Sequence, residues 1–336
     1  MERYVIRVLE SDQTVQVVDG VSVLDACLEG EVPFRYNCRS GECGECVAKL
    51  VSGEVRELAG ADPAVFNDGH RKEGFILACM CYARSDLVLS TKLSSESRSA
   101  VGLHDVTVKA IERHGSAIYE VTVEADTPID YASGQYFEWV IPGISPNRSY
   151  SAANRSGGRD VVFHVKTYDS GEVSQYLRRG NLGVGDGLKL KGPFGSFGLG
   201  PRGYVPAVMV AGGTGLAPIC SILEEAFARG ITRTIYLFFG VQGTRDLYHL
   251  DQLSKWASQH ENFEFFPTVA DTLDGAEWTG DCGLVTDVIE RRLIDAMGYE
   301  AYLCGPPGMI DAAAVVLESK GVDSDDIHAD RFVAVA

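Results

Sequence analysis

A group of three cysteines near the N-terminus constrains the fold of this 336-residue chain more than any other feature. Cys38, Cys43 and Cys46 are spaced C-x4-C-x2-C in the stretch CRSGECGEC, with Gly41 and Gly44 between them. Glycines suit a loop that wraps closely and turns its backbone N–H groups toward a negatively charged ligand. The spacing therefore predicts a tight loop that brings three sulfurs to one place.

Three kinds of site use cysteines at such close spacing. A structural zinc site usually pairs two C-x2-C knuckles, whereas here Cys38 precedes the one such pair and the later pair, Cys79 and Cys81, is C-x-C. A redox dithiol needs only one C-x2-C and leaves Cys38 unexplained. The spacing C-x4-C-x2-C with a distant fourth cysteine is typical of a plant-type [2Fe–2S] cluster. We interpret the group as an iron–sulfur site, with zinc as the main alternative.

Cysteine usage and charge argue against several classes of protein. The chain has nine cysteines, an odd number, and its start, MERYVIRVLE, alternates like a strand rather than like a signal peptide. These features favour a reducing compartment, so we expect a cytoplasmic protein. The net charge is −17, and residues 200–336 contribute most of it with 20 acidic and 9 basic side chains. Nucleic acid and anionic membranes are therefore poor candidates as partners.

Three regions of different pattern follow one another along the chain. Residues 1–95 combine strand-like alternation with one helix near 23–30, and the polar, aperiodic residues 92–103 have a linker composition. Residues 103–199 are nearly all strand and turn, which predicts a β-barrel. In residues 200–336, strands alternate with helices, one of them over 246–259, which predicts a parallel sheet covered on both faces.

The third region contains a glycine turn of the kind that approaches a pyrophosphate. VMVAGGTGLAPI at 208–219 reads as a strand, a turn and the start of a helix. A second strand is followed by CGPPGM at 304–309, and the barrel region carries RSYS at 148–151. Each motif is weak evidence alone, and their common order along one chain gives them weight.

The ordered set RSYSAAN, FHVKTY, GEVS, GPFG, GGTG-x-AP and CGPP resembles the ferredoxin–NAD(P)+ reductase superfamily. GFILACMCYARSD resembles the segment of plant-type ferredoxins that carries the last cluster ligand. The whole chain is similar to the reductase components of bacterial multicomponent oxygenases that act on aromatic compounds. This resemblance implies a β-grasp ferredoxin domain at 1–95, an antiparallel Greek-key FAD barrel at 103–199 and a doubly wound NAD domain at 200–336. The implied cofactors are a [2Fe–2S] cluster, FAD and NADH.

The resemblance also assigns individual residues. It makes Cys79 the fourth cluster ligand beside Cys38, Cys43 and Cys46, and leaves Cys81 as an extra thiol. The residues implied to contact FAD are Arg148, Ser149, Tyr150, Ser151, His164, Val165, Lys166, Gly171, Val173 and Ser174. Those implied to contact the nicotinamide nucleotide are Gly212, Gly213, Thr214, Gly215, Asp246, Cys304, Gly305 and Pro306. The side chains implied to lie at the reacting rings are Tyr150, Ser151, Cys304 and Phe332.

The choice of cofactor and of partner follows from charge and from the resemblance. An NADPH site needs cations for the 2′-phosphate, whereas Arg245 here adjoins Asp246 in an acidic region, which favours NADH. The resemblance implies a terminal oxygenase or its ferredoxin as the partner, and we expect the chain to act as a monomer. Two alternatives stay open: a reductase for another acceptor, such as a sugar-deoxygenation dehydrase or a separate ferredoxin, and a non-enzymatic redox sensor.

Overall fold

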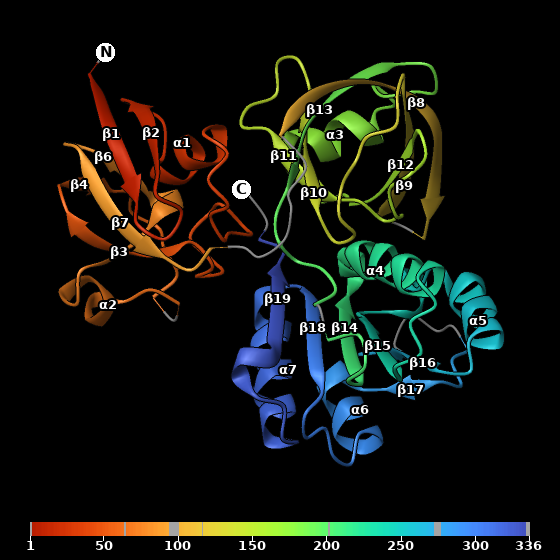
Figure 1. The fold of residues 1–336 in the computed structure, drawn as a ribbon. Helices are drawn as coiled ribbons and strands as arrows, with labels where there is room; N and C mark the ends of the chain where they lie inside the picture. Colours follow the sequence, from red (N-terminus) through yellow and green to blue (C-terminus); the bar gives the residue numbers. More distant parts are fainter. Residues whose placement is uncertain are drawn as a thin grey trace. The chain divides into compact units, whose positions relative to one another are not determined.

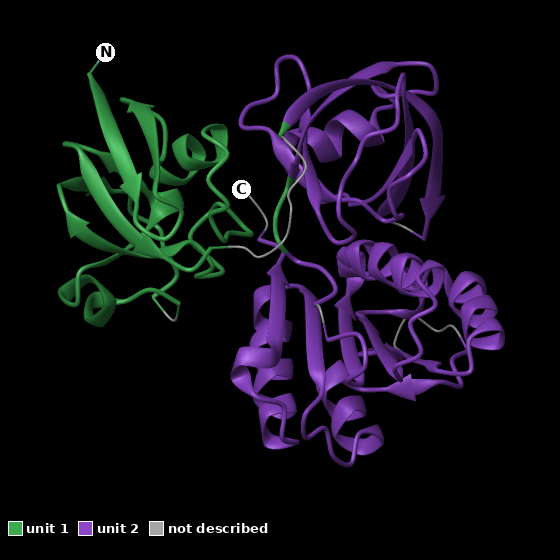
Figure 2. Ribbon diagram, viewed as in Figure 1, with its two compact units in different colours: residues 1–101, 194–196 green, residues 102–193, 197–336 purple. Residues whose placement is uncertain are grey.

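The chain forms two compact units in a computed structural model that describes residues 2–63, 65–93, 101–115, 117–200, 202–271 and 277–333 (Figure 1). Unit 1 contains residues 1–101 and 194–196, and unit 2 contains residues 102–193 and 197–336 (Figure 2). Most of the linker predicted over 92–103 and the closing residues 334–336 lie outside the described residues. The boundary proposed between residues 199 and 200 falls inside unit 2.

Unit 1 is a mixed sheet packed against one helix. Its five strands have the order β2-β1-β7-β3-β5, with β1 antiparallel to β2 and parallel to β7. The strands are β1 (Arg3–Val8), β2 (Gln13–Val18), β3 (Val47–Ser52), β5 (Phe75–Leu77) and β7 (Leu87–Thr91). Helix α1 (Val23–Glu29) begins where the Ser22 hydroxyl accepts a hydrogen bond from the N–H of Asp25. A small ladder of β4 (Val55–Glu57) with β6 (Cys81–Ala83), helix α2 (Asp68–Lys72) and the 3₁₀ turn η1 (Ala78–Met80) complete the unit.

The first part of unit 2, residues 102–193, is the barrel. Its six strands have the order β11-β10-β13-β8-β9-β12, which is Greek-key connectivity. An antiparallel bridge between Ala152 and Phe163 joins the two ends of this order. The elements are β8 (Gly102–His114), β9 (Ile118–Ala125), β10 (Tyr136–Val140), β11 (Arg148–Ser151), β12 (Asp160–Lys166), α3 (Glu172–Arg178) and β13 (Gly187–Phe194). Buried aromatic side chains, Phe137, Trp139 and Phe163 among them, fill the interior.

The second part of unit 2, residues 202–333, is the lobe, whose six strands are all parallel in the order β17-β16-β15-β14-β18-β19. The strands are β14 (Ala207–Gly212), β15 (Ile235–Val241), β16 (Phe263–Val269), β17 (Asp281–Cys282), β18 (Glu300–Gly305) and β19 (Ile327–Arg331). Helices α4 (Leu216–Ala228) and α5 (Leu250–Gln259) pack on one face, and α6 (Val285–Arg292) and α7 (Pro307–Ser319) on the other. The doubly wound arrangement predicted from the sequence is confirmed.

Two details of the lobe differ from the sequence pattern. The helix predicted over 246–259 begins only at Leu250, because His249 has a left-handed backbone with φ of 58° and so cannot continue a right-handed helix. Strand β19 pairs with β18 at the edge of the sheet, although nothing in its sequence distinguishes it from a terminal coil.

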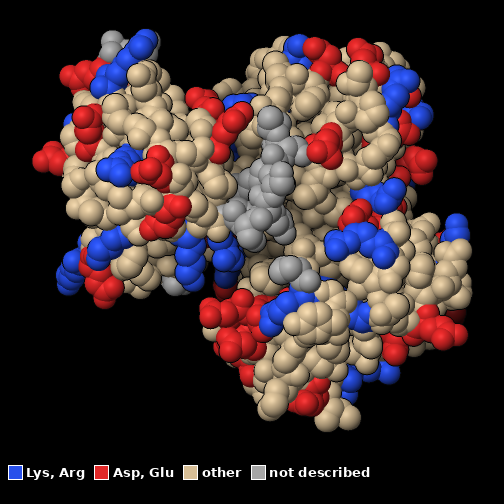
Figure 3. Space-filling model, in the orientation of Figure 1, with Lys and Arg blue, Asp and Glu red and all other residues tan. Residues whose placement is uncertain are grey.

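The surface of the lobe carries the acidic excess seen in the sequence. Acidic side chains gather over the region of α7 and β19 (Figure 3). No helix among the described residues has the length and apolar character needed to span a membrane.

Candidate functional site

The loop between α1 and β3 turns its backbone toward sulfur. The N–H groups of Ser40 and Glu42 lie 3.4 and 3.3 Å from Sγ of Cys38, and the N–H of Cys38 lies 3.4 Å from Sγ of Cys43. Such N–H groups stabilise negative charge on thiolates and on a cluster that they ligate. The local backbone therefore fits an anionic metal–sulfur group.

Two glycines allow this loop to close. Gly41 and Gly44 have φ of 86° and 74°, in the left-handed region that L side chains rarely adopt. A Cβ added at Gly44 would lie 2.7 Å from Cγ1 of Val65, and one at Gly41 would lie 3.1 Å from Cα of Ala61. The glycines are thus required both by backbone conformation and by close packing.

The structure distinguishes Cys79 from Cys81. Cys79 lies in η1, where its Sγ is 3.2 Å from Sγ of Cys46, and its thiol also interacts electrostatically with Cys38 and Cys43. Cys81 begins β6 and is fully buried, and this burial raises the pKa of its thiol to about 12. The thiols of Cys38, Cys43, Cys46 and Cys79 form one group, a donor set that fits a [2Fe–2S] cluster.

The RSYS motif forms β11 on the barrel. Tyr150 is half-buried, and its ring lies against Trp139 with the ring centroids 4.7 Å apart. Burial raises the pKa of Tyr150, so its phenol stays neutral. Arg148 pairs across the ladder with Trp139, whereas Ser149 is exposed and Ser151 is buried. The motif thus offers an aromatic surface and, two residues before it, a cation, as a flavin and its pyrophosphate require.

His164 does not present its ring to solvent. Its Nδ1 lies 3.1 Å from the hydroxyl of Tyr248 and its Nε2 lies 3.5 Å from Oε2 of Glu120. Burial lowers the pKa of His164 to about 4, so the imidazole is neutral near pH 7. Of the two residues that follow on β12, Val165 is buried in the barrel core and Lys166 is exposed.

A side chain from α3 stabilises the turn that precedes this helix. Gly171 has φ of 106° and precedes the helix, and Val173 and Ser174 are buried. The Ser174 hydroxyl accepts a hydrogen bond from the N–H of Tyr168 at 3.0 Å. The positive φ of Gly171 explains why glycine is needed there.

The glycine turn and the CGPP segment meet at the ends of two adjacent strands. β14 and β18 are neighbours, with Ala211 paired to Cys304. A Cβ added at Gly215 would lie 2.2 Å from the carbonyl oxygen of Cys304, and one at Gly212 would lie 2.5 Å from Sδ of Met309. Only glycine fits this packing, and the turn runs directly into α4 at the carboxyl edge of the sheet, where dinucleotide-binding folds meet a pyrophosphate.

Four further residues from the sequence motifs surround this turn. Gly213 has φ of 54°, Thr214 is buried within the same turn, Gly305 ends β18 and Pro306 precedes α7. They line the carboxyl edge of the sheet, which is where open α/β folds bind nucleotides.

Cys304 and Phe332 lie at this same edge. Cys304 is fully buried with its Sγ 3.9 Å from Oδ2 of Asp330, and burial together with that carboxyl raises the pKa of the thiol well above its usual value. The N–H of Phe332 donates to the carbonyl oxygen of Gly305 at 2.8 Å. Sequence reasoning missed Asp330, whose only signal is its place two residues before Phe332.

Asp246 closes a 3₁₀ turn (Thr244–Asp246) after β15. Its carboxylate accepts a hydrogen bond from the N–H of Gly243 at 3.3 Å. The turn follows the strand next to β14 at the carboxyl edge, the position from which an acidic residue reaches a ribose in dinucleotide-binding folds.

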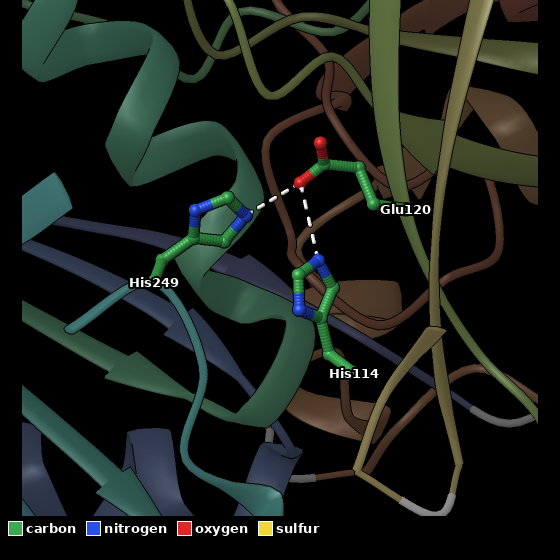
Figure 4. A group of neighbouring side chains, drawn as sticks. All are labelled: His114, Glu120 and His249. Atoms are coloured by element: carbon green, nitrogen blue, oxygen red, sulfur yellow. Dashed lines mark hydrogen bonds and ion pairs between the residues drawn. The ribbon is translucent and has the colours of Figure 1, made fainter. Parts of the chain in front are cut away.

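Sequence reasoning also missed a cluster of His114, Glu120 and His249 between the barrel and the lobe (Figure 4). No motif contains these residues, and only the fold brings them together.

Three family models match successive parts of the chain. Residues 6–84 match the 2Fe-2S iron-sulfur cluster binding domain, residues 104–198 the oxidoreductase FAD-binding domain, and residues 209–314 the oxidoreductase NAD-binding domain. The zinc alternative for the cysteine loop is therefore set aside.

Curated relatives match nearly the full length. The chain is 31% identical to the reductase component of phenol 2-monooxygenase from Pseudomonas sp. (strain CF600), over 99% of this chain and 95% of that protein. It is 31% identical to the propane 2-monooxygenase reductase component of Mycolicibacterium smegmatis, over 96% and 95%. Among solved structures, the Amycolatopsis cytochrome P450 reductase matches with a TM-score of 0.85 and 29% identity, covering 98% of both chains.

Proposed function

Because the chain belongs to the ferredoxin–NAD(P)+ reductases that carry a 2Fe-2S domain, we propose that it supplies a multicomponent oxygenase with electrons. They pass from NADH through FAD to the [2Fe–2S] cluster, and then to the terminal oxygenase or its ferredoxin. The observation that carries this proposal is the presence, in one chain, of the four-thiol group, the RSYS strand and the paired glycine and CGPP turns. All three sites are needed for such a path.

The three groups divide the chemistry, since NADH delivers a hydride, FAD exchanges both electron pairs and single electrons, and the cluster takes one electron at a time. The residues of the chain bind and orient these groups. We propose that Arg148 holds the flavin pyrophosphate, Tyr150 covers the flavin ring and Ser151 hydrogen-bonds near N5. The neutral thiol of Cys304 would lie near the nicotinamide, and the ring of Phe332 would lie close to the flavin. Hydride transfer needs no general acid or base, which agrees with the raised pKa values of Tyr150 and Cys304.

The partner oxygenase, rather than this chain, determines which organic substrate is oxidised. The relatives are reductase components of phenol and propane monooxygenases at the same 31% identity, so the expected substrate class widens from aromatic compounds to include alkanes. A cytochrome P450 is the second candidate acceptor, supported by the TM-score of 0.85 to a reductase of that kind. We further propose that the protein acts as a cytoplasmic monomer.

Turnover with an artificial acceptor tests the proposal. We expect the holoprotein to oxidise NADH rapidly with either ferricyanide or cytochrome c, because the flavin and the cluster each offer an exit for electrons. Stopped-flow reduction of the flavin and steady-state cytochrome c reduction measure the two steps. A redox sensor would instead show little turnover with either acceptor. Reconstitution with purified oxygenase components and with a cytochrome P450 then identifies the acceptor.

We expect NADH to be preferred over NADPH. The 2′-phosphate of NADPH would lie beside Asp246 in a region with 20 acidic and 9 basic side chains. Two like charges about 4 Å apart in water cost about 1 kcal/mol, so a dianionic phosphate predicts a kcat/KM about tenfold or more in favour of NADH. Asp246→Ala should narrow this ratio, because it leaves Arg245 without its acidic neighbour. A higher kcat/KM for NADPH in the unmodified protein would contradict the assignment.

A further inference from the structure

Three side chains from separate elements point toward one another where the barrel meets the lobe (Figure 4). His114 ends β8 and Glu120 lies on β9, so both belong to one hairpin of the barrel. His249 belongs to the lobe, where it immediately precedes α5. The three side chains are 25%, 18% and 23% exposed, so the cluster is largely shielded from solvent.

The ligand atoms have spacings close to those of a metal site. Oε2 of Glu120 lies 2.5 Å from Nε2 of His249 and 3.6 Å from Nε2 of His114. All three atoms lie within 4.8 Å of one another. In a tetrahedral zinc site with bonds of about 2.0–2.1 Å, the ligand atoms are about 3.3 Å apart. The spacing from Glu120 to His249 is shorter than this value, and the spacing from Glu120 to His114 is slightly longer.

Among the residues that the structure describes, Nε2 of His114 has no hydrogen-bond partner. This atom is shut off from solvent and lies 3.6 Å from Oε2 of Glu120. A buried polar atom without a partner is costly, and a bound water or ion is one way to satisfy it. The ring of His249 is aimed at the same carboxylate from a left-handed backbone that a histidine rarely adopts.

A further histidine, His164, lies beside the same carboxylate, with its ring stacked on that of His249. Nε2 of His164 lies 3.5 Å from Oε2 of Glu120, and Nδ1 of His164 lies 3.1 Å from the hydroxyl of Tyr248. When that hydroxyl donates to Nδ1, the other ring nitrogen carries the proton and faces the carboxylate. Outer hydrogen bonds of this kind orient the ligands of metal sites.

We propose that His114, Glu120 and His249 bind a divalent cation of the zinc class. Two imidazole nitrogens and a carboxylate oxygen are a donor set typical of zinc, and the fourth position is left to water. The cation would be separate from the iron of the cysteine loop, because these ligands belong to unit 2 and the four thiols belong to unit 1.

Such a cation would fasten the barrel to the lobe. The hairpin turn already packs closely there, because a Cβ added at Gly115 would lie 2.0 Å from the carbonyl oxygen of Arg245. Arg245 is the neighbour of Asp246, which we assign to the ribose. A bound cation would therefore hold the segment that carries Asp246 against the barrel.

Metal analysis of the holoprotein tests the site. The protein and its variants His114→Gln and His249→Asn are dialysed against excess Zn²⁺ and then against metal-free buffer. Zinc and iron are then counted on the same samples. Asparagine is chosen at position 249 because it tolerates a left-handed backbone. We expect the unmodified protein to retain one more zinc per chain than either variant, with the same iron content.

The control is His260→Gln, which removes a histidine that stacks on Phe227, away from the cluster. It should retain zinc like the unmodified protein. We also expect Zn²⁺ to raise the melting temperature of the unmodified protein and of the control but of neither cluster variant. X-ray absorption of the bound zinc should show nitrogen and oxygen ligands. Equal zinc contents in all four proteins, or coordination by sulfur alone, would overturn the proposal, and the latter would point to thiols such as the exposed Cys282.

Discussion

Cys79→Ser is expected to abolish the [2Fe–2S] cluster, whereas Cys81→Ser is expected to retain it. The Sγ of Cys79 lies 3.2 Å from that of Cys46, within the four-thiol group, and Cys81 is a buried core residue at the start of β6. Loss of one of four thiolate ligands leaves iron with an incomplete donor set. Iron content and the electron paramagnetic resonance signal of the reduced protein measure the difference.

The Cys79→Ser variant also distinguishes electron transfer through the cluster from electron transfer directly from the flavin. Cytochrome c reduction by Cys79→Ser should fall by about 100-fold or more, since even losses outside the ligands of a metal site cost about 10- to 100-fold. Ferricyanide reduction should persist, because it can take electrons from the flavin. Cys81→Ser is the matched control, with the same change two residues away. The opposite pattern, in which Cys81→Ser loses its iron and Cys79→Ser keeps it, would reverse the ligand assignment.

Gly215→Ala is expected to disable the nucleotide site while leaving the flavin bound. The added Cβ would lie 2.2 Å from the carbonyl oxygen and 2.5 Å from the carbonyl carbon of Cys304, which are rigid backbone atoms of β18. The glycine turn and the CGPP segment must then move apart. A misplacement of about 1 Å in a reacting geometry can cost about 100-fold, and we expect a loss of that size in kcat/KM for NADH.

Gly187→Ala provides the control for this experiment. It makes the same chemical change at the start of β13 in the barrel, where an added Cβ meets nothing within 4 Å. Its kcat/KM should stay close to that of the unmodified protein. Stopped-flow reduction of the flavin by NADH measures both variants, and the flavin absorbance checks that the barrel is intact. Equal rates for the two variants would show that the close approach at Gly215 is not needed for nucleotide binding.

The motifs predicted from the sequence depend on local backbone chemistry. Gly41, Gly44 and Gly171 have positive φ values, and this requirement is visible in a sequence because few other residues meet it. The alternation of strands and helices after residue 200 likewise predicted the parallel sheet, since such connections need a helix to cross from one strand to the next. The assignment of individual side chains to FAD and NADH stays a prediction.

Two features could not be predicted from the sequence: the direction in which a side chain points, and contacts between residues far apart in the chain. His164 lies on the strand that the FAD-barrel resemblance predicts, but its ring points to Tyr248 and Glu120 rather than outward. The resemblance predicts the position of His164 on the strand, but it does not predict the direction in which the ring points. His249 contacts Glu120, which lies 129 positions away in the sequence, and its left-handed backbone, which shortens the predicted helix, is adopted by only a small fraction of residues other than glycine.

The pairing of β14 with β18 has a consequence for biosynthesis. It joins residues 207–211 to residues 300–304, so the nucleotide turns cannot meet until the ribosome has nearly completed the chain. All four cysteines of the proposed cluster, in contrast, have been synthesised once residue 79 has emerged. Domains fold as units in order of synthesis, so unit 1 can acquire iron while the site for the electron donor does not yet exist.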